Sequence, residues 1–221
     1  YLTTDAENTI VKGNVVNTTS TGHGIQVEAN VNNNITGNNI TTFANNTFGI
    51  RIFGANFSNF TNNVVKTFGN LSFAVQIETS SANNSFRNNV FNTTARHVNV
   101  TNSANANNFS LSAITAGTNI VGGANLGGNY YDNSTVGGKA AWSLNCTNDG
   151  RGICDTPLAH AANNVDFYPL ALPSSCRTLS TAGQTYVLDG SLTSTATCFN
   201  INASGVTLDC NGYAVEYANA S

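Results

Sequence analysis

Three charged side chains lie at outward positions of short alternating segments, where they could act on a sugar chain. Glu28, Arg51 and Glu78 stand at the polar positions of segments in which apolar and polar residues alternate. With these segments stacked two rows apart, the two glutamates would be separated by about 9.6 Å, near the upper limit for an inverting glycosidase. The alternative is a surface ion pair, worth about 0–1 kcal/mol. Because this face offers no lysine or histidine as a base, we predict no catalytic residue and no enzyme.

Metal ligands are scarce in the sequence. The chain has three histidines, His23, His97 and His160, with no methionine and no Cys-X-X-Cys pair. His23 and His97 precede equivalent segments, but three rows of strand spacing would hold them about 14 Å apart. They cannot share one ion, so we predict neither a metal site nor a cofactor.

The five cysteines all lie in the C-terminal part of the chain and indicate disulfides formed in an oxidising compartment. Cys146 and Cys154 flank a short glycine-containing loop, and we predict a bond between them. A second bond is predicted between Cys176 and Cys198. Cys210 is then left over, and we expect it to be a small buried apolar residue.

Asparagine followed two residues later by serine or threonine is frequent and favours an exported, glycosylated protein. For any single site the alternative is an unused sequon in an Asn/Thr-rich turn. Fifteen candidate glycosylation sites occur: Asn17, Asn34, Asn39, Asn45, Asn56, Asn59, Asn70, Asn83, Asn92, Asn99, Asn108, Asn133, Asn145, Asn202 and Asn219.

Composition narrows the class of protein further. The 221 residues carry a net charge of −3, and only 9 % of them are charged. Lysine and arginine do not cluster, which excludes a nucleic-acid-binding surface. No apolar run approaches the roughly 20 residues of a membrane span. Asparagine and threonine are poor helix formers, whereas valine, isoleucine and threonine suit strands, so an all-β fold is expected.

The elements that must position these residues recur with a period near 25. Asn14, Asn38, Asn63 and Asn89 follow similar apolar motifs and are spaced 24, 25 and 26 residues apart. Short strands at this period predict a parallel β-helix, a solenoid whose coils stack about 4.8 Å apart. The four asparagines should stack as a hydrogen-bonded ladder and tolerate the left-handed backbone of a corner. A two-sheet sandwich is the alternative, but sandwiches do not repeat at constant register.

Three regions follow from this pattern. Residues 1–115 are predicted to form β-helix coils, and residues 116–173 a glycine-rich irregular segment that contains the disulfide loop. Strands resume in 174–221, which we interpret as the start of a β-helix that continues into residue 1 of the next copy.

The register across the two ends supports that interpretation. The segment around Leu208 matches the coil motif and places Leu208 at Val11, with Asn211 at Asn14. If Ser221 were followed by Tyr1, Asn211 and Asn14 would be 24 residues apart, within the observed period. A coincidental match and a domain-boundary error are the alternatives. The predicted subunit junction comprises Val11, Val16, Leu208 and Tyr213.

Several segments resemble right-handed β-helix proteins of the periplasmic copper-binding and carbohydrate-binding or sugar-hydrolase type, which are found in archaeal surface proteins. The similar stretches are Gly205–Tyr213, Asn129–Tyr131, Gly152–Pro157 and Asn164–Leu170. The resemblance implies a right-handed parallel β-helix and, before the Asp155-Thr-Pro motif, a calcium loop. Arg151 stands there in place of a carboxylate, so calcium is not predicted. These are motifs of fold rather than of activity.

We therefore expect a structural repeating subunit of an extracellular, glycosylated filament or surface layer. Its partners would be copies of itself, joined head-to-tail, and N-linked glycans, and its location extracellular or at the cell surface. The alternative is a secreted carbohydrate-binding β-helix module and, less favoured, a polysaccharide lyase or hydrolase.

Overall fold

The computed structural model describes residues 7–217, apart from 30, 102–105, 133–142, 144–145, 147–150, 172–175, 180–181, 184, 189 and 211. Among these residues every element of two or more residues is a strand. Within the same part of the chain, no helix is long and apolar enough to cross a membrane. The predicted all-β class is thus confirmed.

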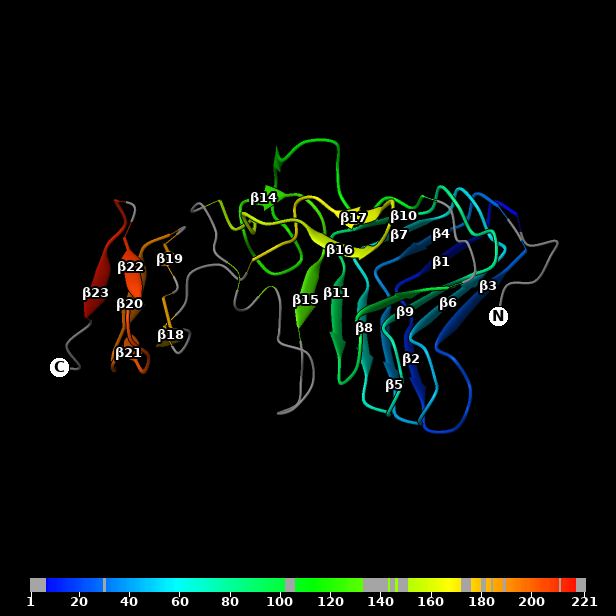
Figure 1. The fold of residues 1–221 in the computed structure, drawn as a ribbon, viewed down its shortest axis with the longest axis horizontal. Helices are drawn as coiled ribbons and strands as arrows, with labels where there is room; N and C mark the ends of the chain where they lie inside the picture. Colours follow the sequence, from blue (N-terminus) through cyan, green and yellow to red (C-terminus); the bar gives the residue numbers. More distant parts are fainter. Residues whose placement is uncertain are drawn as a thin grey trace.

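Three parallel sheets run along the N-terminal solenoid, which we define as residues 7–110 together with 130–132 (Figure 1). The first sheet has the order β1 (Ile10–Lys12), β4 (Asn34–Thr36), β7 (Asn59–Thr61), β10 (Ser85–Arg87). The second has the order β2 (Val15–Thr18), β5 (Asn39–Thr42), β8 (Val64–Thr67), β11 (Val90–Thr93), β15 (Tyr130–Asp132). The third has the order β3 (Ile25–Glu28), β6 (Ile50–Phe53), β9 (Val75–Glu78), β12 (Val98–Val100).

Alternate residues of each strand point into the solenoid and form columns along its axis. In the first sheet the column Val11, Ile35, Phe60 and Phe86 is in strict register from strand to strand. The rings of Phe60, Phe86 and Phe109 stack with centroid separations of 4.7 and 4.8 Å. Burial of such columns between neighbouring coils is the main stabilising contribution of a solenoid.

The corner before each ladder asparagine differs in detail from the sequence expectation. The left-handed residue is the one that precedes the asparagine, not the asparagine itself. The four positions are Gly13, Gly37, Asn62 and Asn88, with φ of 70°, 65°, 56° and 54°. Glycine and asparagine tolerate this backbone conformation best, which explains their alternation at one corner.

The segment predicted as irregular caps the N-terminal solenoid. Its β15 is the fifth strand of the second sheet, paired with β11. Two antiparallel pairs complete the segment, β13 (Thr115–Ala116) with β14 (Asn125–Leu126), and β16 (Leu158–Ala161) with β17 (Asn164–Asp166). We call the β16–β17 pair the cap hairpin.

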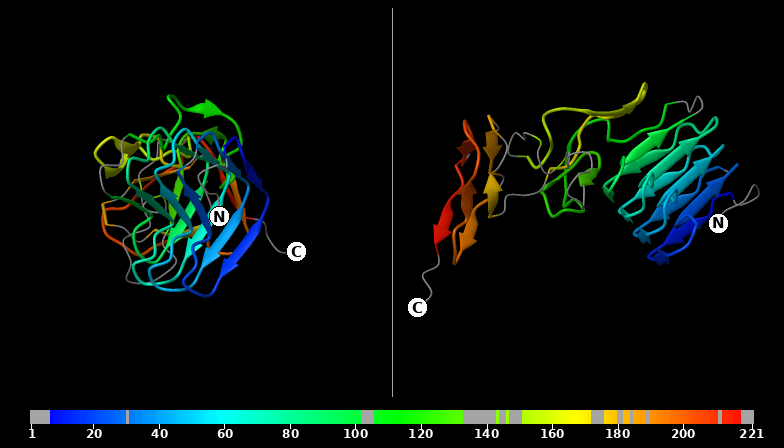
Figure 2. Two further views of the ribbon diagram at one scale, coloured as in Figure 1. Left: turned by 90° about the vertical axis from the view of Figure 1, so that its right-hand side faces the viewer. Right: turned by 60° about the horizontal axis from the view of Figure 1, so that its bottom comes forward.

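The C-terminal unit, residues 176–217, is a second and shorter stack of coils (Figure 2). Its strands pair in parallel two by two, and none pairs with the N-terminal solenoid among the described residues. The pairs are β18 (Arg177–Leu179) with β21 (Phe199–Ile201), β19 (Thr185–Val187) with β22 (Thr207–Asp209), and β20 (Leu192–Ser194) with β23 (Val215–Tyr217).

Candidate functional site

The four asparagines picked out by their period form one ladder along the second sheet. The Nδ2 of Asn14 donates to Oδ1 of Asn38 at 2.9 Å, and Asn38 donates in the same way to Asn63 at 3.0 Å. Asn63 donates to Asn89, also at 3.0 Å. Each receiving Oδ1 also accepts the backbone N–H of the preceding asparagine, so the ladder satisfies main chain and side chain together.

The ladder continues past the predicted rungs and ends on a carboxylate. Asn89 donates to Oδ1 of Asn129 at 2.8 Å, and Asn129 donates to Oδ2 of Asp166 at 3.2 Å. An ionised carboxylate only accepts hydrogen bonds, so it needs no further acceptor beyond the last coil. In its ionised form, Asp166 therefore terminates the ladder without leaving a buried donor unpaired.

A second ladder runs parallel to the first and ends on the same hairpin. Its rungs are Asn33, Ser58, Asn84, Asn107 and Asn164. The side chains of Asn84 and Asn107 donate to the next rung at 3.0 and 3.1 Å, and backbone N–H groups make the earlier links. The cap hairpin thus closes both ladders, with Asn164 and Asp166 at alternate positions of β17.

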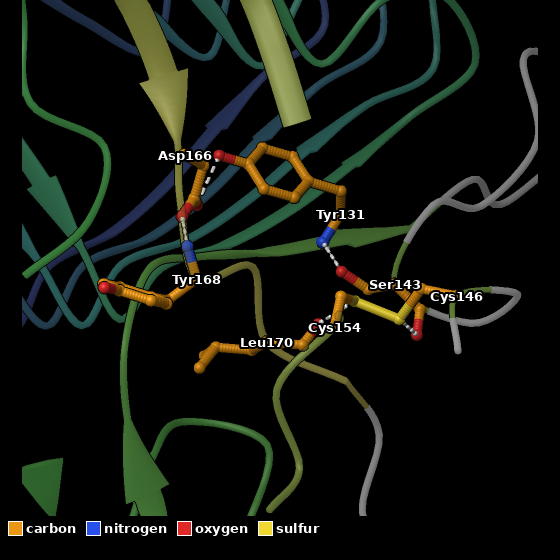
Figure 3. The surroundings of a disulfide bond; sticks show 7 residues. All are labelled: Tyr131, Ser143, Cys146, Cys154, Asp166, Tyr168 and Leu170. Atoms are coloured by element: carbon orange, nitrogen blue, oxygen red, sulfur yellow. Dashed lines mark hydrogen bonds between the residues drawn. A yellow bond between two sulfur atoms is a disulfide. The ribbon is translucent and has the colours of Figure 1, made fainter. Parts of the chain in front are cut away.

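The end of the first ladder holds the most perturbed ionisable groups (Figure 3). Oδ2 of Asp166 accepts the Tyr131 hydroxyl at 2.9 Å, and Oδ1 accepts the backbone N–H of Tyr168 at 3.1 Å. Complete burial raises the pKa of Asp166 to about 7, although these hydrogen bonds oppose the shift. Burial and the neighbouring Asp166 likewise raise the pKa of Tyr131.

A half-buried histidine contacts this pair of groups. Nε2 of His160 lies 3.0 Å from the Tyr131 hydroxyl, and burial lowers the pKa of His160 to about 3. Gly128 makes room for the carboxylate, because a Cβ at this position would overlap the Asp166 side chain. Tyr131 and Asp166 are fully buried, so this pair is closed to a substrate.

Both predicted disulfides are confirmed. Cys146 is bonded to Cys154, and nearby Ser143 Oγ accepts the backbone N–H of Tyr131 at 2.8 Å (Figure 3). Cys176–Cys198 joins the two coils of the C-terminal unit immediately before β18 and β21.

Cys210 is exposed and not disulfide-bonded, so its prediction as a buried apolar residue was wrong. It follows β22, the outermost strand of its sheet, and no further coil covers it in the described structure.

Among the described residues, no strand covers the first coil of the N-terminal solenoid. β1, β2 and β3 are each the last strand of a sheet. Inward-facing Val11 and Val16 remain only half-buried, whereas Ile35 and Ile40, their partners in the next coil, are fully buried. The outward side chains of Ile10 and Val15 are 67 % and 72 % exposed.

The outer coil of the C-terminal unit is likewise uncovered in the described part of the chain. β21, β22 and β23 have no partner on their outer side among the described strands, and they lie at the far end from β1–β3 (Figure 1). Ile201 and Tyr217 pair in register with Leu179 and Ser194 of the inner coil, yet they are 60 % and 63 % exposed. Leu208 is half-buried.

The four predicted junction residues do not all occupy equivalent positions. Leu208 and Val11 are the central residues of β22 and β1. Val16 lies within β2, whereas Tyr213 lies in the turn before β23. The turn after β22 is longer than the turn after β1, so residue-by-residue correspondence ends at this turn.

The charged side chains considered for catalysis form a pair on the outer face of the third sheet. Nη2 of Arg51 lies 2.8 Å from Oε2 of Glu78. Glu28 accepts a hydrogen bond from Gln26 at 3.1 Å and is separated from Glu78 by the strand that holds Phe53. The two carboxylates are thus two coils apart, with Arg51 engaged by one of them.

The histidines pack against aromatic rings or form hydrogen bonds within the fold. His23 stacks on Phe48 with centroids 4.8 Å apart, and Nε2 of His97 lies 2.7 Å from the carbonyl oxygen of Asp132. Burial lowers the pKa of both histidines. Within the described part of the chain, no three His, Cys, Asp or Glu side chains are close enough to hold a metal ion.

The predicted glycosylation sites divide by exposure. Asn133, Asn145 and Asn219 lie outside the described residues. The half-buried acceptors are Asn34, Asn56, Asn92 and Asn99, and three of these amides are used within the fold: Asn56 accepts Ala82 N–H, Asn92 donates to Asp132 and Asn99 donates to Gln76. The exposed acceptors are Asn17, Asn39, Asn45, Asn59, Asn70, Asn83, Asn108 and Asn202.

Comparison with known proteins gives one match. A family model described as "Periplasmic copper-binding protein (NosD)" matches residues 1–136. No curated protein and no solved structure matches the chain. Copper sites need clustered His, Cys or Met ligands. The chain has no methionine, and His23 and His97 are three strands apart in the third sheet, so the described residues do not fit a copper site.

Proposed function

The chain belongs to the NosD family of periplasmic copper-binding proteins, and we propose that within it this protein is a structural subunit that assembles head-to-tail by continuation of its β-helix. The observation that carries the proposal is the pair of open coil ends, β1–β3 and β21–β23, at opposite ends of the molecule.

An open coil presents two surfaces that only another coil satisfies together. Its outer strand leaves a row of backbone donors and acceptors, and its inward apolar side chains lack a layer above them. Water can form hydrogen bonds with the exposed backbone groups. It does not remove the unfavourable solvent exposure of the apolar side chains of Ile201, Leu208 and Tyr217. Unprotected strand edges of this kind associate unless they are covered. A contact between two different ends of one molecule extends into an open fibre unless its rotation closes a ring.

The register predicted from sequence also brings unlike charges together. If Leu208 of β22 stacks on Val11 of β1 in the next copy, Asp209 lies beside Lys12. Opposite charges at neighbouring positions of paired strands favour this register over a shift that would separate them.

The disulfides and the exposed sequons fit a protein located outside the cytoplasm. Two disulfides fit an oxidising, non-cytoplasmic compartment. We propose that the eight exposed sequon asparagines carry N-linked glycans. The low charge content leaves few groups to keep a polymer soluble, and glycans would supply this property.

Sedimentation of the chain with one charge placed at the junction tests the proposal. The unaltered protein should form a concentration-dependent series of polymers. Leu208→Asp should weaken association by about two orders of magnitude, because a carboxylate would be buried without a partner. Val11→Asp should act in the same way from the other end.

Thr207→Asp is the matched control, because Thr207 is exposed on the outward side of the same strand. It should leave polymers largely intact, and all three variants should keep the melting temperature of the cap-bearing solenoid. A chain that sediments as a monomer at every concentration would overturn the proposal, as would equal effects of T207D and L208D.

A further inference from the structure

Arg87 is a cation held in a pocket without a counter-charge. It ends β10 and lies in register with Thr61 of β7, on the outward side of the first sheet. Its Nε is buried and has no hydrogen-bond partner, and no described residue forms an ion pair with its guanidinium. A charged group that is partly removed from water normally has such a partner.

The pocket beside Arg87 is built where the N-terminal solenoid meets the segment before β15. It has a volume of about 230 Å³ and is lined by Thr61, Asn62, Arg87, Asn88, Leu111, Leu126 and Gly127. None of these residues is acidic, so the guanidinium charge is not balanced from within the pocket.

The walls are held in place by hydrogen bonds. Asn88 Nδ2 donates to Asn62 Oδ1 at 2.6 Å, and Asn88 Oδ1 accepts the backbone N–H of Ile120 at 2.7 Å. Leu111 N–H donates to the Gly127 carbonyl at 3.0 Å. The loop that carries the two leucines is thereby fixed against the corner that follows Arg87.

The lining prescribes the chemistry of a ligand. The guanidinium offers a planar, charged set of donors that matches a carboxylate. Asn62 has donors on Nδ2 that no described group accepts, and the Thr61 hydroxyl can accept a further hydrogen bond. Leu111 and Leu126 offer an apolar surface that suits the C–H face of a sugar ring.

We propose that this pocket binds a single acidic sugar residue, a hexuronate, with its carboxylate on Arg87. Its volume is below the roughly 300–1,000 Å³ of pockets that hold drug-sized ligands, so one ring fits and a longer chain would extend into solvent. The site is independent of the two open ends, and the proposal stands whether or not the chain polymerises.

Calorimetric titration with free galacturonate and with galactose tests the proposal. These probes share the same ring and differ in the carboxylate. The unaltered chain should bind galacturonate, and galactose should bind at least about tenfold more weakly, because it lacks the charge-assisted hydrogen bonds. Added salt should weaken the binding of galacturonate but not of galactose.

Variants locate the site. Arg87→Gln should weaken galacturonate binding about tenfold and abolish its preference over galactose, whereas Arg87→Lys should keep part of that preference. Arg96→Gln removes an exposed arginine elsewhere and should have no effect. Equal binding of the two sugars, no binding of galacturonate, or unchanged binding by R87Q would each overturn the proposal. The comparison of the two sugars on the unaltered chain decides the matter even if R87Q does not fold.

Discussion

The two stacks of coils in this molecule, the N-terminal solenoid and the C-terminal unit, are stabilised by different interactions. In the N-terminal solenoid, four or five strands share each sheet, two amide ladders run through the corners, and no cysteine occurs. The C-terminal unit has two strands in each sheet and a disulfide between its coils. A coil with neighbours on both sides is stabilised by packing, whereas a pair of coils with one shared interface is braced covalently.

The same contrast explains how each stack ends. The last coil of the N-terminal solenoid is covered by its own cap hairpin, where Asp166 accepts the last ladder donor. The outer coil of the C-terminal unit has no such cover in the described structure, and its inward Ile201 and Tyr217 stay exposed. The comparison indicates that the inward apolar side chains of a terminal coil are buried only where another segment packs on that coil.

The largest expected effect is on the packed stack. Phe86 is fully buried between the rings of Phe60 and Phe109, so Phe86→Ala should cost the N-terminal solenoid about 3–5 kcal/mol of unfolding free energy. Hydrogen exchange followed by mass spectrometry should show faster exchange in β7–β11 and no change in β18–β23. Phe57→Ala is the control, because Phe57 is 57 % exposed and its loss should change stability by less than about 0.5 kcal/mol. Equal changes in exchange in both stacks would contradict the independent stability of the N-terminal solenoid and the C-terminal unit.

The braced stack should respond to loss of its disulfide. Replacing both Cys176 and Cys198 by serine should destabilise the C-terminal unit by about 3 kcal/mol, because the bond closes a loop with a separation of 22 residues. Proteolysis should then cut within 176–217 and spare the N-terminal solenoid. Cys210→Ser should leave the cleavage pattern unchanged. Resistance of the double variant would show that packing alone holds the two coils.

The smallest effect is a pH dependence at the cap. The folded chain holds Asp166 protonated up to a pKa of about 7, against 3.8 as the ordinary value. Between these values the unfolded chain binds fewer protons, so the contribution of Asp166 to stability is full at low pH and is lost as the pH rises. Asp166→Asn removes this term, so the stability of the variant relative to wild type should increase as the pH rises toward 7.

Thermal unfolding of both proteins across this range measures the difference. His160 has the opposite dependence, because its lowered pKa favours the neutral form, but it is present in both proteins and cancels. A difference between D166N and wild type that does not change with pH would show that Asp166 is ionised throughout. The stability of the capped N-terminal solenoid would then have no pH dependence from Asp166 that distinguishes it from the C-terminal unit.

Much of the N-terminal solenoid could be predicted from its period, because identical corners 24 to 26 residues apart allow few architectures. The ladder beyond Asn89 was missed for a physical reason. Asn129-Tyr130-Tyr131 repeats the pattern of Asn89-Val90-Phe91 and pairs with it, but an inserted loop places it 40 residues later. A search for the pattern without the period would have found it.

Other features could not be predicted from the repeat. Asp166 replaces an amide by a carboxylate and belongs to an antiparallel hairpin, so neither its type nor its strand resembles a rung. Arg87 occupies an outward position like any surface cation, and only the segment that folds over it makes a pocket. The burial of Cys210 was misjudged because it depends on a covering coil that the described chain does not supply.

Electron microscopy of the purified native protein tests the central claim most directly. If open coils join end to end, the images should show unbranched filaments one solenoid wide, with an axial repeat equal to the length of one molecule. Isolated particles with both ends bare, at concentrations where the protein is otherwise folded, would contradict it.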